Sequence, residues 1–214
     1  MKYKAVIFDM DGTIVDSEAA WGKAFVTVLS ELGIETKNKH PQIGGVSVNE
    51  NWKIILEKEN IKTDKTIQEL RDLTVEVFKR EIYTITLKPG VKEFFKQLND
   101  LNVRIALATS THKEEASVIF ANLGISNFFE EATYGDDVTN KKPDPEVFLK
   151  TLDKLKLKKE DCLVIEDSPT GIIAAQAAGI DVVAIVWEKD YPKELKSANF
   201  IASSFDEIYN KIIL

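Results

Sequence analysis

The sequence holds few of the residues that build disulfides or zinc sites. Its 214 residues include one cysteine and two histidines. The single cysteine, Cys162, excludes an intramolecular disulfide and suits a reducing compartment. Cys162 begins an apolar run and is interpreted as a small buried hydrophobic residue. His40 and His112 have no accompanying cysteine or histidine cluster, so no zinc site is expected.

Long apolar runs and an excess of positive charge are also missing. No run approaches the roughly 20 apolar residues that a membrane span needs, and the N-terminal stretch lacks the features of a secretory signal. The chain has 28 Lys and Arg against 35 Asp and Glu, a formal net charge of -7. Non-specific nucleic-acid binding relies on the opposite charge. The sequence predicts a soluble, cytoplasmic protein with no membrane and no nucleic-acid partner, and nothing in it demands more than a monomer.

Strand-like apolar runs alternate with amphipathic helical patterns over most of the chain. The expected strands are 4–8, 103–108, 162–166, 181–186 and a weaker 198–202. The clearest helical patterns are 91–101, 145–156, 169–179 and 205–214, where apolar residues recur at a helical period. This alternation predicts an α/β fold, with a three-layer Rossmann-like core around a parallel sheet.

Residues 17–87 interrupt the alternation. Three helices are expected there, over 18–33, 49–60 and 65–82, with no convincing strand between them. A helical insertion after the first strand predicts a small cap domain over residues 17–87. The α/β core is then formed by residues 1–16 and 88–214.

Polar side chains gather where the predicted strands end. Asp9 and Asp11 stand one residue apart after the first strand, and two charges so close repel unless a cation or a shared proton separates them. Other polar groups follow later strands or precede the helix at 145–156: Thr109, Ser110, Thr111, Lys141, Lys142, Glu166, Asp167 and Ser168. Ligand sites of open α/β sheets lie at the carboxyl ends of the strands. We therefore expect these groups to converge on one edge of the sheet.

This set of groups fits phosphoryl transfer. Clustered carboxylates need a cation, and their hard oxygens suit Mg²⁺. A lysine and hydroxyls can hold the phosphate oxygens, and positioning with charge neutralisation is most of what phosphoryl transfer requires. One carboxylate can attack phosphorus to form an aspartyl-phosphate, while a second donates and later accepts a proton.

Four ordered motifs resemble those of the haloacid dehalogenase superfamily. They are FDMDGT (8–13), ATS (108–110), KKPDPEVF (141–148) and IEDSPTG (165–171). The resemblance covers essentially the whole chain, and four motifs in the right order are highly specific. It is to the branch with a helical cap after the first strand, similar to β-phosphoglucomutase and sugar-phosphate phosphatases.

The resemblance implies a role for each strand-end residue. Asp9 would be the nucleophile and Asp11 the general acid and base. Thr109 and Ser110 would bind the phosphoryl group, and Lys142 would neutralise its charge. Lys142 is preferred to Lys141 on its spacing before the PDPEVF stretch.

The resemblance also implies a Mg²⁺ site and a substrate loop. Asp9, Asp167 and Asp11, the last through its backbone carbonyl, would hold the metal ion. Glu166 would support it directly or through water. Gly45 lies in a QIGGVS stretch that resembles a substrate-specificity loop of this branch, although an ordinary turn glycine remains the alternative.

Several candidate residues also have a purely structural interpretation. Thr109 could be a helix N-cap, and Asp167 could cap the helix that begins near residue 169. Lys142 could be a solvated surface charge. Trp21 and Trp52 could line the substrate cavity, although core packing is the commoner role of tryptophan at helical spacing.

The sequence favours a Mg²⁺-dependent phosphatase that acts on a small-molecule phosphate ester, such as a sugar or polyol phosphate. A phosphomutase of the β-phosphoglucomutase kind is the first alternative. Where that enzyme has a histidine and an arginine, this chain has Trp21 (or Ala20) and Val48, so hydrolysis is preferred. The second alternative is a non-catalytic module that senses phosphate or metal, although every acidic and basic group that the chemistry needs is present.

Overall fold

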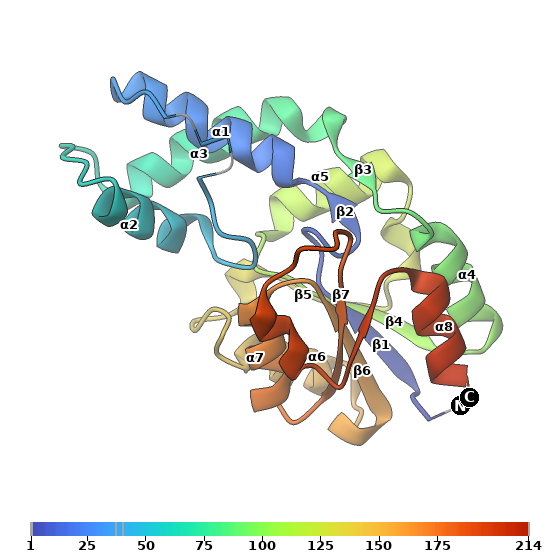
Figure 1. The fold of residues 1–214 in the computed structure, drawn as a ribbon. Coiled ribbons are helices and arrows are strands. Elements are labelled where there is room, and N and C mark those ends of the chain that lie inside the picture. Colours follow the sequence, from blue (N-terminus) through green and yellow to red (C-terminus); the bar gives the residue numbers. More distant parts are fainter. Residues whose placement is uncertain (1, 37, 40, 214) are drawn as a thin grey trace.

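The protein has a central six-stranded parallel sheet, seen here in a computed structural model that describes residues 2–36, 38–39 and 41–213. His40 and Leu214 lie outside these residues. The strand order is β5-β4-β1-β6-β7-β8, which puts β1 between β4 and β6 (Figure 1). The strands are β1 (Ala5–Phe8), β4 (Arg104–Ala108), β5 (Glu131–Thr133), β6 (Cys162–Glu166), β7 (Asp181–Ile185) and β8 (Phe200–Ala202). All neighbouring pairs are parallel, so their carboxyl ends share one edge.

Helices cover both faces of this sheet. In β1, Val6 and Phe8 pack into one apolar cluster, and Ala5 and Ile7 pack into another. The first cluster includes α4 (Val91–Asp100), α5 (Lys113–Leu123) and α8 (Phe205–Ile213), and the second includes α6 (Glu146–Leu155) and α7 (Pro169–Ala177). Burial on both faces explains why the strands are continuous apolar runs. The predicted three-layer α/β core is confirmed.

Three helices form a group of their own beside the sheet (Figure 1). They are α1 (Glu18–Glu31), α2 (Val48–Lys58) and α3 (Ile67–Glu81), and residues 17–81 are called the helical insert below. They pack around a separate apolar cluster that includes Phe25, Trp52 and Leu70. Trp52 is fully buried and its Nε1 donates to Thr74 Oγ1 at 2.8 Å, so its interpretation as a core residue is confirmed.

The sequence pattern does not predict four of the elements. Three are very short: β5 and the antiparallel pair β2 (Val15–Asp16) and β3 (Thr86–Leu87), which flanks the helical insert. Two or three residues are too few to show a strand period. The fourth is α5, which carries two glutamates in its first turn and buries only a narrow apolar strip. Short 3₁₀ helices complete the chain: Ile82–Thr84, Ser126–Phe128, Gly135–Asp137, Lys159–Asp161 and Lys193–Ser197.

Two expectations about single features also agree with the structure. Cys162 is fully buried in β6, and burial raises the pKa of its thiol to about 11, which suits an unreactive core residue. Among the described helices, none combines the length with the apolar character that crossing a bilayer requires.

The start of α3 provides a test of local stability. The Thr66 hydroxyl accepts from Glu69 N at 3.2 Å, and the Glu69 carboxylate accepts from Thr66 N at 2.7 Å, which is a capping box. We expect Thr66→Ala to lower the free energy of unfolding by about 1 kcal/mol in urea titrations followed by circular dichroism. Thr66→Ser should lose much less, and equal losses in both variants would contradict the cap.

Candidate active site

Two central strands bring three acidic residues together. Asp9 directly follows β1, while Glu166 ends β6 and Asp167 comes next. One carboxylate oxygen of each residue lies within 4.8 Å of the others. Because β1 and β6 are parallel neighbours, their carboxyl ends meet at the same edge of the sheet. This acidic cluster contains three of the residues singled out in the sequence.

Lys142 lies between two of these carboxylates. Its Nζ is 2.7 Å from Asp9 Oδ1 and 2.8 Å from Glu166 Oε1, and its side chain is 1% exposed. Burial alone would lower the pKa of Lys142, but the two carboxylates outweigh burial and raise it. The surface-charge interpretation of Lys142 is therefore wrong. Lys141 instead donates to two backbone carbonyls.

The acidic cluster carries more negative charge than Lys142 compensates. Burial raises the pKa of Asp9 to about 7, against the opposing effect of Lys142. Burial and the neighbouring Glu166 and Asp9 carboxylates raise the pKa of Asp167 well above its ordinary value. If all three carboxylates were ionised, one ammonium would leave two negative charges uncompensated, and this crowding adds to burial in raising both pKa values. This donor set of hard oxygens fits a divalent cation.

Glu166 is already engaged by its own neighbours. Its Oε1 accepts from Lys142, and its Oε2 accepts from Asp167 N, Ser168 N and Ser168 Oγ at 2.8–2.9 Å. These bonds orient Lys142 and the loop after β6. Ser168 also caps α7, since its side chain accepts from Gly171 N at 3.1 Å. The interpretation of Asp167 as the helix cap is therefore wrong.

The turn after Asp11 requires a glycine for two reasons. Gly12 has a φ of +82°, and a Cβ at this position would overlap the Asp167 carboxylate. Thr13 Oγ1 donates to Asp167 Oδ1 at 3.2 Å, and Trp187 Nε1 donates to the Gly12 carbonyl at 2.7 Å. The turn thus holds Asp167 beside the end of β1, where Asp9 lies.

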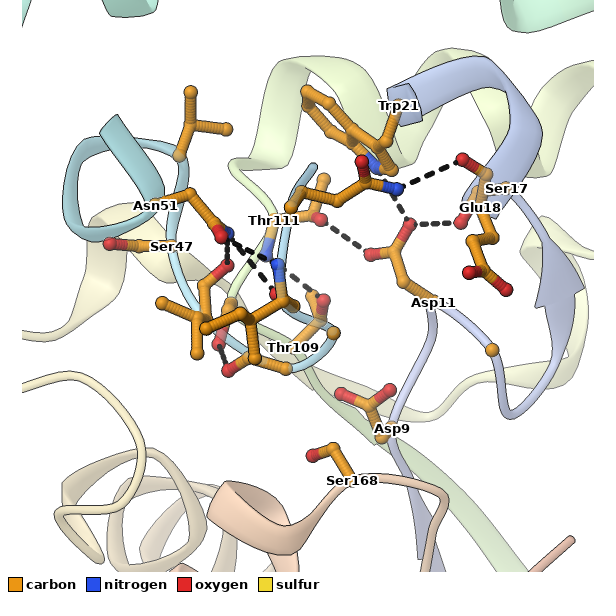
Figure 2. A pocket seen from close by; sticks show the side chains of 18 of the residues that line it. Asp9, Asp11, Ser17, Glu18, Trp21, Ser47, Asn51, Thr109, Thr111 and Ser168 are labelled. Carbon is orange, nitrogen blue, oxygen red and sulfur yellow. Dashed lines mark hydrogen bonds between the residues drawn. The ribbon is translucent and has the colours of Figure 1, made fainter. Parts of the chain in front are cut away.

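The Asp11 carboxylate does not join the acidic cluster. It accepts from Ser17 Oγ at 2.5 Å and from Trp21 Nε1 at 3.1 Å, and both donors lie at the start of the helical insert. It also accepts from Thr111 Oγ1 of the core at 2.6 Å (Figure 2). In the described part of the chain, the clustered metal-type ligands are Asp9, Glu166 and Asp167. The structure therefore brings Asp11 to the same site but directs its side chain elsewhere.

Thr109 and Ser110 follow β4 on the other side of β1. Thr109 is buried and its Oγ1 accepts from Thr111 N at 3.0 Å. The N-cap position of α5 belongs to His112, so the interpretation of Thr109 as that cap is wrong. Ser110 Oγ donates to the carbonyl of Gly45 at 3.5 Å, which links the core to the helical insert.

The loop 42–47 of the helical insert lies against the core. Gly45 has a φ of +72°, and a Cβ there would overlap the side chain of Ser168. Its carbonyl also accepts from Thr170 Oγ1 at 3.3 Å. Asn51, buried in α2, holds the loop with three hydrogen bonds to its backbone. Because Gly45 has no Cβ, the loop 42–47 can approach Ser168 closely, which an ordinary turn glycine would not need to do.

These groups surround a cavity of about 480 Å³ between the core and the helical insert. Asp9, Asp11 and Thr109 line it from the core, and Trp21 lines it from α1 (Figure 2). Its volume is typical of small-molecule sites, which range over roughly 300–1,000 Å³. Trp21 stacks on Phe78 with the ring centroids 3.6 Å apart. Trp21 also packs against the apolar clusters of the core and of the helical insert, so both of its interpretations agree with the structure.

Several lining residues are not singled out in the sequence. Ser17 precedes a helix and looks like an N-cap, but its side chain caps nothing and donates to Asp11. Arg71 and Glu115 look like ordinary solvated charges on helices, yet both line the cavity. No local pattern distinguishes them, because their positions depend on how α3 and α5 meet.

Comparison with known proteins gives consistent results. A family model described as haloacid dehalogenase-like hydrolase matches residues 6–185. The phosphorylated carbohydrates phosphatase of Thermotoga maritima is 34% identical over 203 residues, which is 93% of each chain. The phosphoglycolate phosphatase of Photorhabdus laumondii is 29% identical over 98% of this chain and 92% of its own. A solved β-phosphoglucomutase from Clostridium difficile is 26% identical, with a TM-score of 0.84 over 99% of both chains.

Proposed function

Because the chain belongs to the haloacid dehalogenase-like hydrolase family and is a phosphatase, we propose that it hydrolyses a small sugar or polyol phosphate with a divalent cation. The observation that carries the proposal is the contact of Asp9 with Lys142, beside Asp167, at a cavity large enough for a metabolite. A carboxylate nucleophile, a buried cation and a metal-type ligand set are the parts that phosphoryl transfer needs.

The reaction has two chemical steps. In the first, a carboxylate oxygen of Asp9 attacks phosphorus, the bond from phosphorus to the ester oxygen breaks, and Asp11 gives a proton to the leaving alkoxide. In the second, water attacks the aspartyl-phosphate, Asp11 takes a proton from that water, and the bond between phosphorus and Asp9 breaks. The products are an alcohol and inorganic phosphate, and both carboxyl groups return to their initial states.

The residues that would hold the cation are Asp9, Asp167 and Asp11, the last through its backbone carbonyl. Mg²⁺ is the cation that suits this oxygen set, and when bound it neutralises phosphoryl charge. Gly12 contributes by leaving room for the Asp167 carboxylate.

The phosphoryl oxygens would be held from the other side of β1. Lys142 offers its ammonium, which Glu166 keeps in place through a 2.8 Å ion pair. Thr109 and Ser110 offer hydroxyls from the loop after β4. Gly45, whose carbonyl accepts from Ser110, places the loop 42–47 over the substrate.

Residues 17–87 would then act as a cap, and residues 1–16 and 88–214 as the catalytic core. Ser17 and Trp21 of the insert hold Asp11 of the core, so the two parts share the acid and base. A cap in this position excludes water from the reacting groups and sets specificity by the shape of the cavity.

A phosphomutase is less well supported. Trp21 (or Ala20) occupies the place where the resemblance expects a histidine. The Trp21 indole donates a hydrogen bond but cannot accept a proton, and alanine can do neither. Val48 begins α2 where the resemblance expects an arginine for a second phosphate. Hydrolysis needs neither group.

The direct test is release of inorganic phosphate from a panel of sugar, polyol and nucleotide monophosphates, with Mg²⁺ or with a chelator. We expect release that requires both the metal and Asp9, with sugar or polyol phosphates ranked first. Release that is unaffected by the chelator would contradict the metal dependence. Conversion between sugar-phosphate isomers, with no release, would favour the mutase.

Trp21 provides a smaller test of how Asp11 is positioned. Trp21→Phe keeps a ring to stack on Phe78 but removes the donor to Asp11. We expect kcat to fall about tenfold with KM little changed, which is the scale of one hydrogen bond to a charged group. Steady-state kinetics on the best panel substrate measures both, with exposed Tyr83→Phe as the control. A change in KM alone would mean that Trp21 acts on the substrate and not through Asp11.

A further inference from the structure

A pair of opposite charges lines the cavity where α3 of the helical insert meets α5 of the core. Arg71 comes from α3 and Glu115 from the first turn of α5, and the Arg71 guanidinium lies 4.0 Å from Glu115 Oε1. Their side chains are only 17% and 4% exposed. Neither residue belongs to the catalytic set described above. The pair therefore lines the cavity apart from the residues proposed to hold the phosphate.

Glu115 has an oxygen whose hydrogen-bonding capacity is unused. Its Oε2 is buried and has no hydrogen-bond partner among the described residues. Gln42 lies in a loop that lines the same cavity. Its buried Oε1 likewise has no hydrogen-bond partner among the described residues. Buried acceptors without donors are costly, so a ligand donor that reached either oxygen after a small shift of its side chain would be bound favourably. Both point to a ligand that donates hydrogen bonds.

The cations near this wall are already compensated. An Arg71 amino group donates to His112 Nδ1 at 3.0 Å, which requires that nitrogen to be unprotonated. Burial and then Arg71 lower the pKa of His112. Arg71 pairs with Asp72 at 2.9 Å and lies 4.0 Å from Glu115, and Lys141, another lining cation, donates to two backbone carbonyls. The wall therefore offers little net positive charge to a second anionic group.

We propose that Arg71 and Glu115 select the hydroxyl-bearing end of the substrate and reject a second phosphate or a carboxylate there. This rests on the proposed phosphatase function and specifies its substrate class. Glu115 Oε2 and Gln42 Oε1 accept from substrate hydroxyls, and Arg71 donates to a hydroxyl oxygen. The Glu115 carboxylate repels an anion at the same place. The favoured substrates are monophosphates with a neutral, polyhydroxylated tail.

The test compares three esters: a polyol monophosphate, the bisphosphate of the same polyol, and phosphoglycolate, whose tail is a carboxylate. We expect wild type to have the highest kcat/KM with the polyol monophosphate. Glu115→Gln keeps the size of the side chain and an acceptor but removes its negative charge, while Arg71 keeps its pair with Asp72. It should raise kcat/KM for the two anionic tails at least about tenfold relative to the polyol monophosphate.

Glu114→Gln is the matched control, because Glu114 precedes Glu115 in α5 but is exposed and pairs with Lys79. It should leave the order of the three esters unchanged. Arg71→Met, a second variant, should raise KM for the polyol monophosphate. Identical profiles for Glu115→Gln and Glu114→Gln in folded proteins would overturn the proposal.

Two further measurements separate this inference from the phosphatase function itself. An aryl phosphate has no hydroxyl tail, so its turnover reports on Asp9 chemistry alone. Titration calorimetry in an Asp9→Asn background measures the binding of the three esters without turnover. If the aryl phosphate is not hydrolysed, the phosphatase function fails. If Glu115→Gln raises the affinity for the two anionic tails relative to the polyol monophosphate, selection by Glu115 is still supported. If the relative affinities equal those of the parent, the proposal is overturned.

Discussion

Asparagine in place of Asp9 is expected to lower phosphate-ester turnover by about 10⁴- to 10⁶-fold, the scale of removing a group on which a covalent mechanism depends. An amide oxygen is a poor nucleophile toward phosphorus, and it would also weaken the cation site proposed at Asp9 and Asp167. Phosphate release from the best panel substrate at saturating Mg²⁺ measures the effect. More than about one hundredth of wild-type turnover in a folded variant would contradict the assignment of Asp9.

The loss in this variant should come from chemistry and not from unfolding. Asparagine has the shape of aspartate, and the change removes one of three crowded negative charges while Lys142 keeps its 2.8 Å pair with Glu166. Asp16→Asn is the matched control, since Asp16 lies a few residues away with an exposed side chain. Rapid acid quench during turnover should give a phosphorylated peptide that contains Asp9 in wild type and none in the Asp9→Asn protein.

Much of the core could be predicted because its strands are buried on both faces. Such strands are continuous apolar runs, and polar residues at their ends stand out against them. Asp9, Thr109 and Glu166 were recognisable for that reason. The short strands β2, β3 and β5 could not be recognised, because two or three residues carry no periodic signal.

The cavity wall was less predictable because it depends on how the helices pack. Thr109 and Asp167 both fit the local pattern of a helix cap, yet the caps are His112 and Ser168. Charged residues on a helix usually face water, and nothing near Glu115 in the sequence distinguishes it from Glu114. Only the position of α5 against α3 buries one glutamate and leaves the other exposed. The composition of the cavity wall is therefore a property of the tertiary structure.

Lys142→Met is the second change with a large expected effect, because it alters stability and activity together. Methionine fills much of the lysine volume but leaves Asp9, Glu166 and Asp167 without a buried cation. Removing one partner of a buried ion pair costs about 3–5 kcal/mol. For a chain of this length, that loss lowers the melting temperature by roughly 6–20 °C. Differential scanning calorimetry in chelator measures this loss.

Added Mg²⁺ should separate the effect of Lys142 on stability from its effect on activity. A cation that binds the folded state stabilises it in proportion to the logarithm of its concentration over Kd. A more negative site should bind the ion more tightly, so we expect Mg²⁺ to raise the melting temperature of Lys142→Met more than that of wild type. Turnover should stay at least about 10²-fold lower, because the ammonium that contacts Asp9, and is proposed to hold the phosphoryl oxygens, is still missing.

Lys141→Met tests whether a lysine is needed at position 142 itself or only somewhere in this loop. Lys141 is the preceding residue, but its ammonium donates to backbone carbonyls and not to the acidic cluster. We expect its turnover and its response to Mg²⁺ to stay close to those of wild type. Equal losses in the two variants would mean that the loop needs positive charge in general. Recovery of turnover by Mg²⁺ in Lys142→Met would mean that the lysine only balances charge and takes no part in phosphoryl transfer.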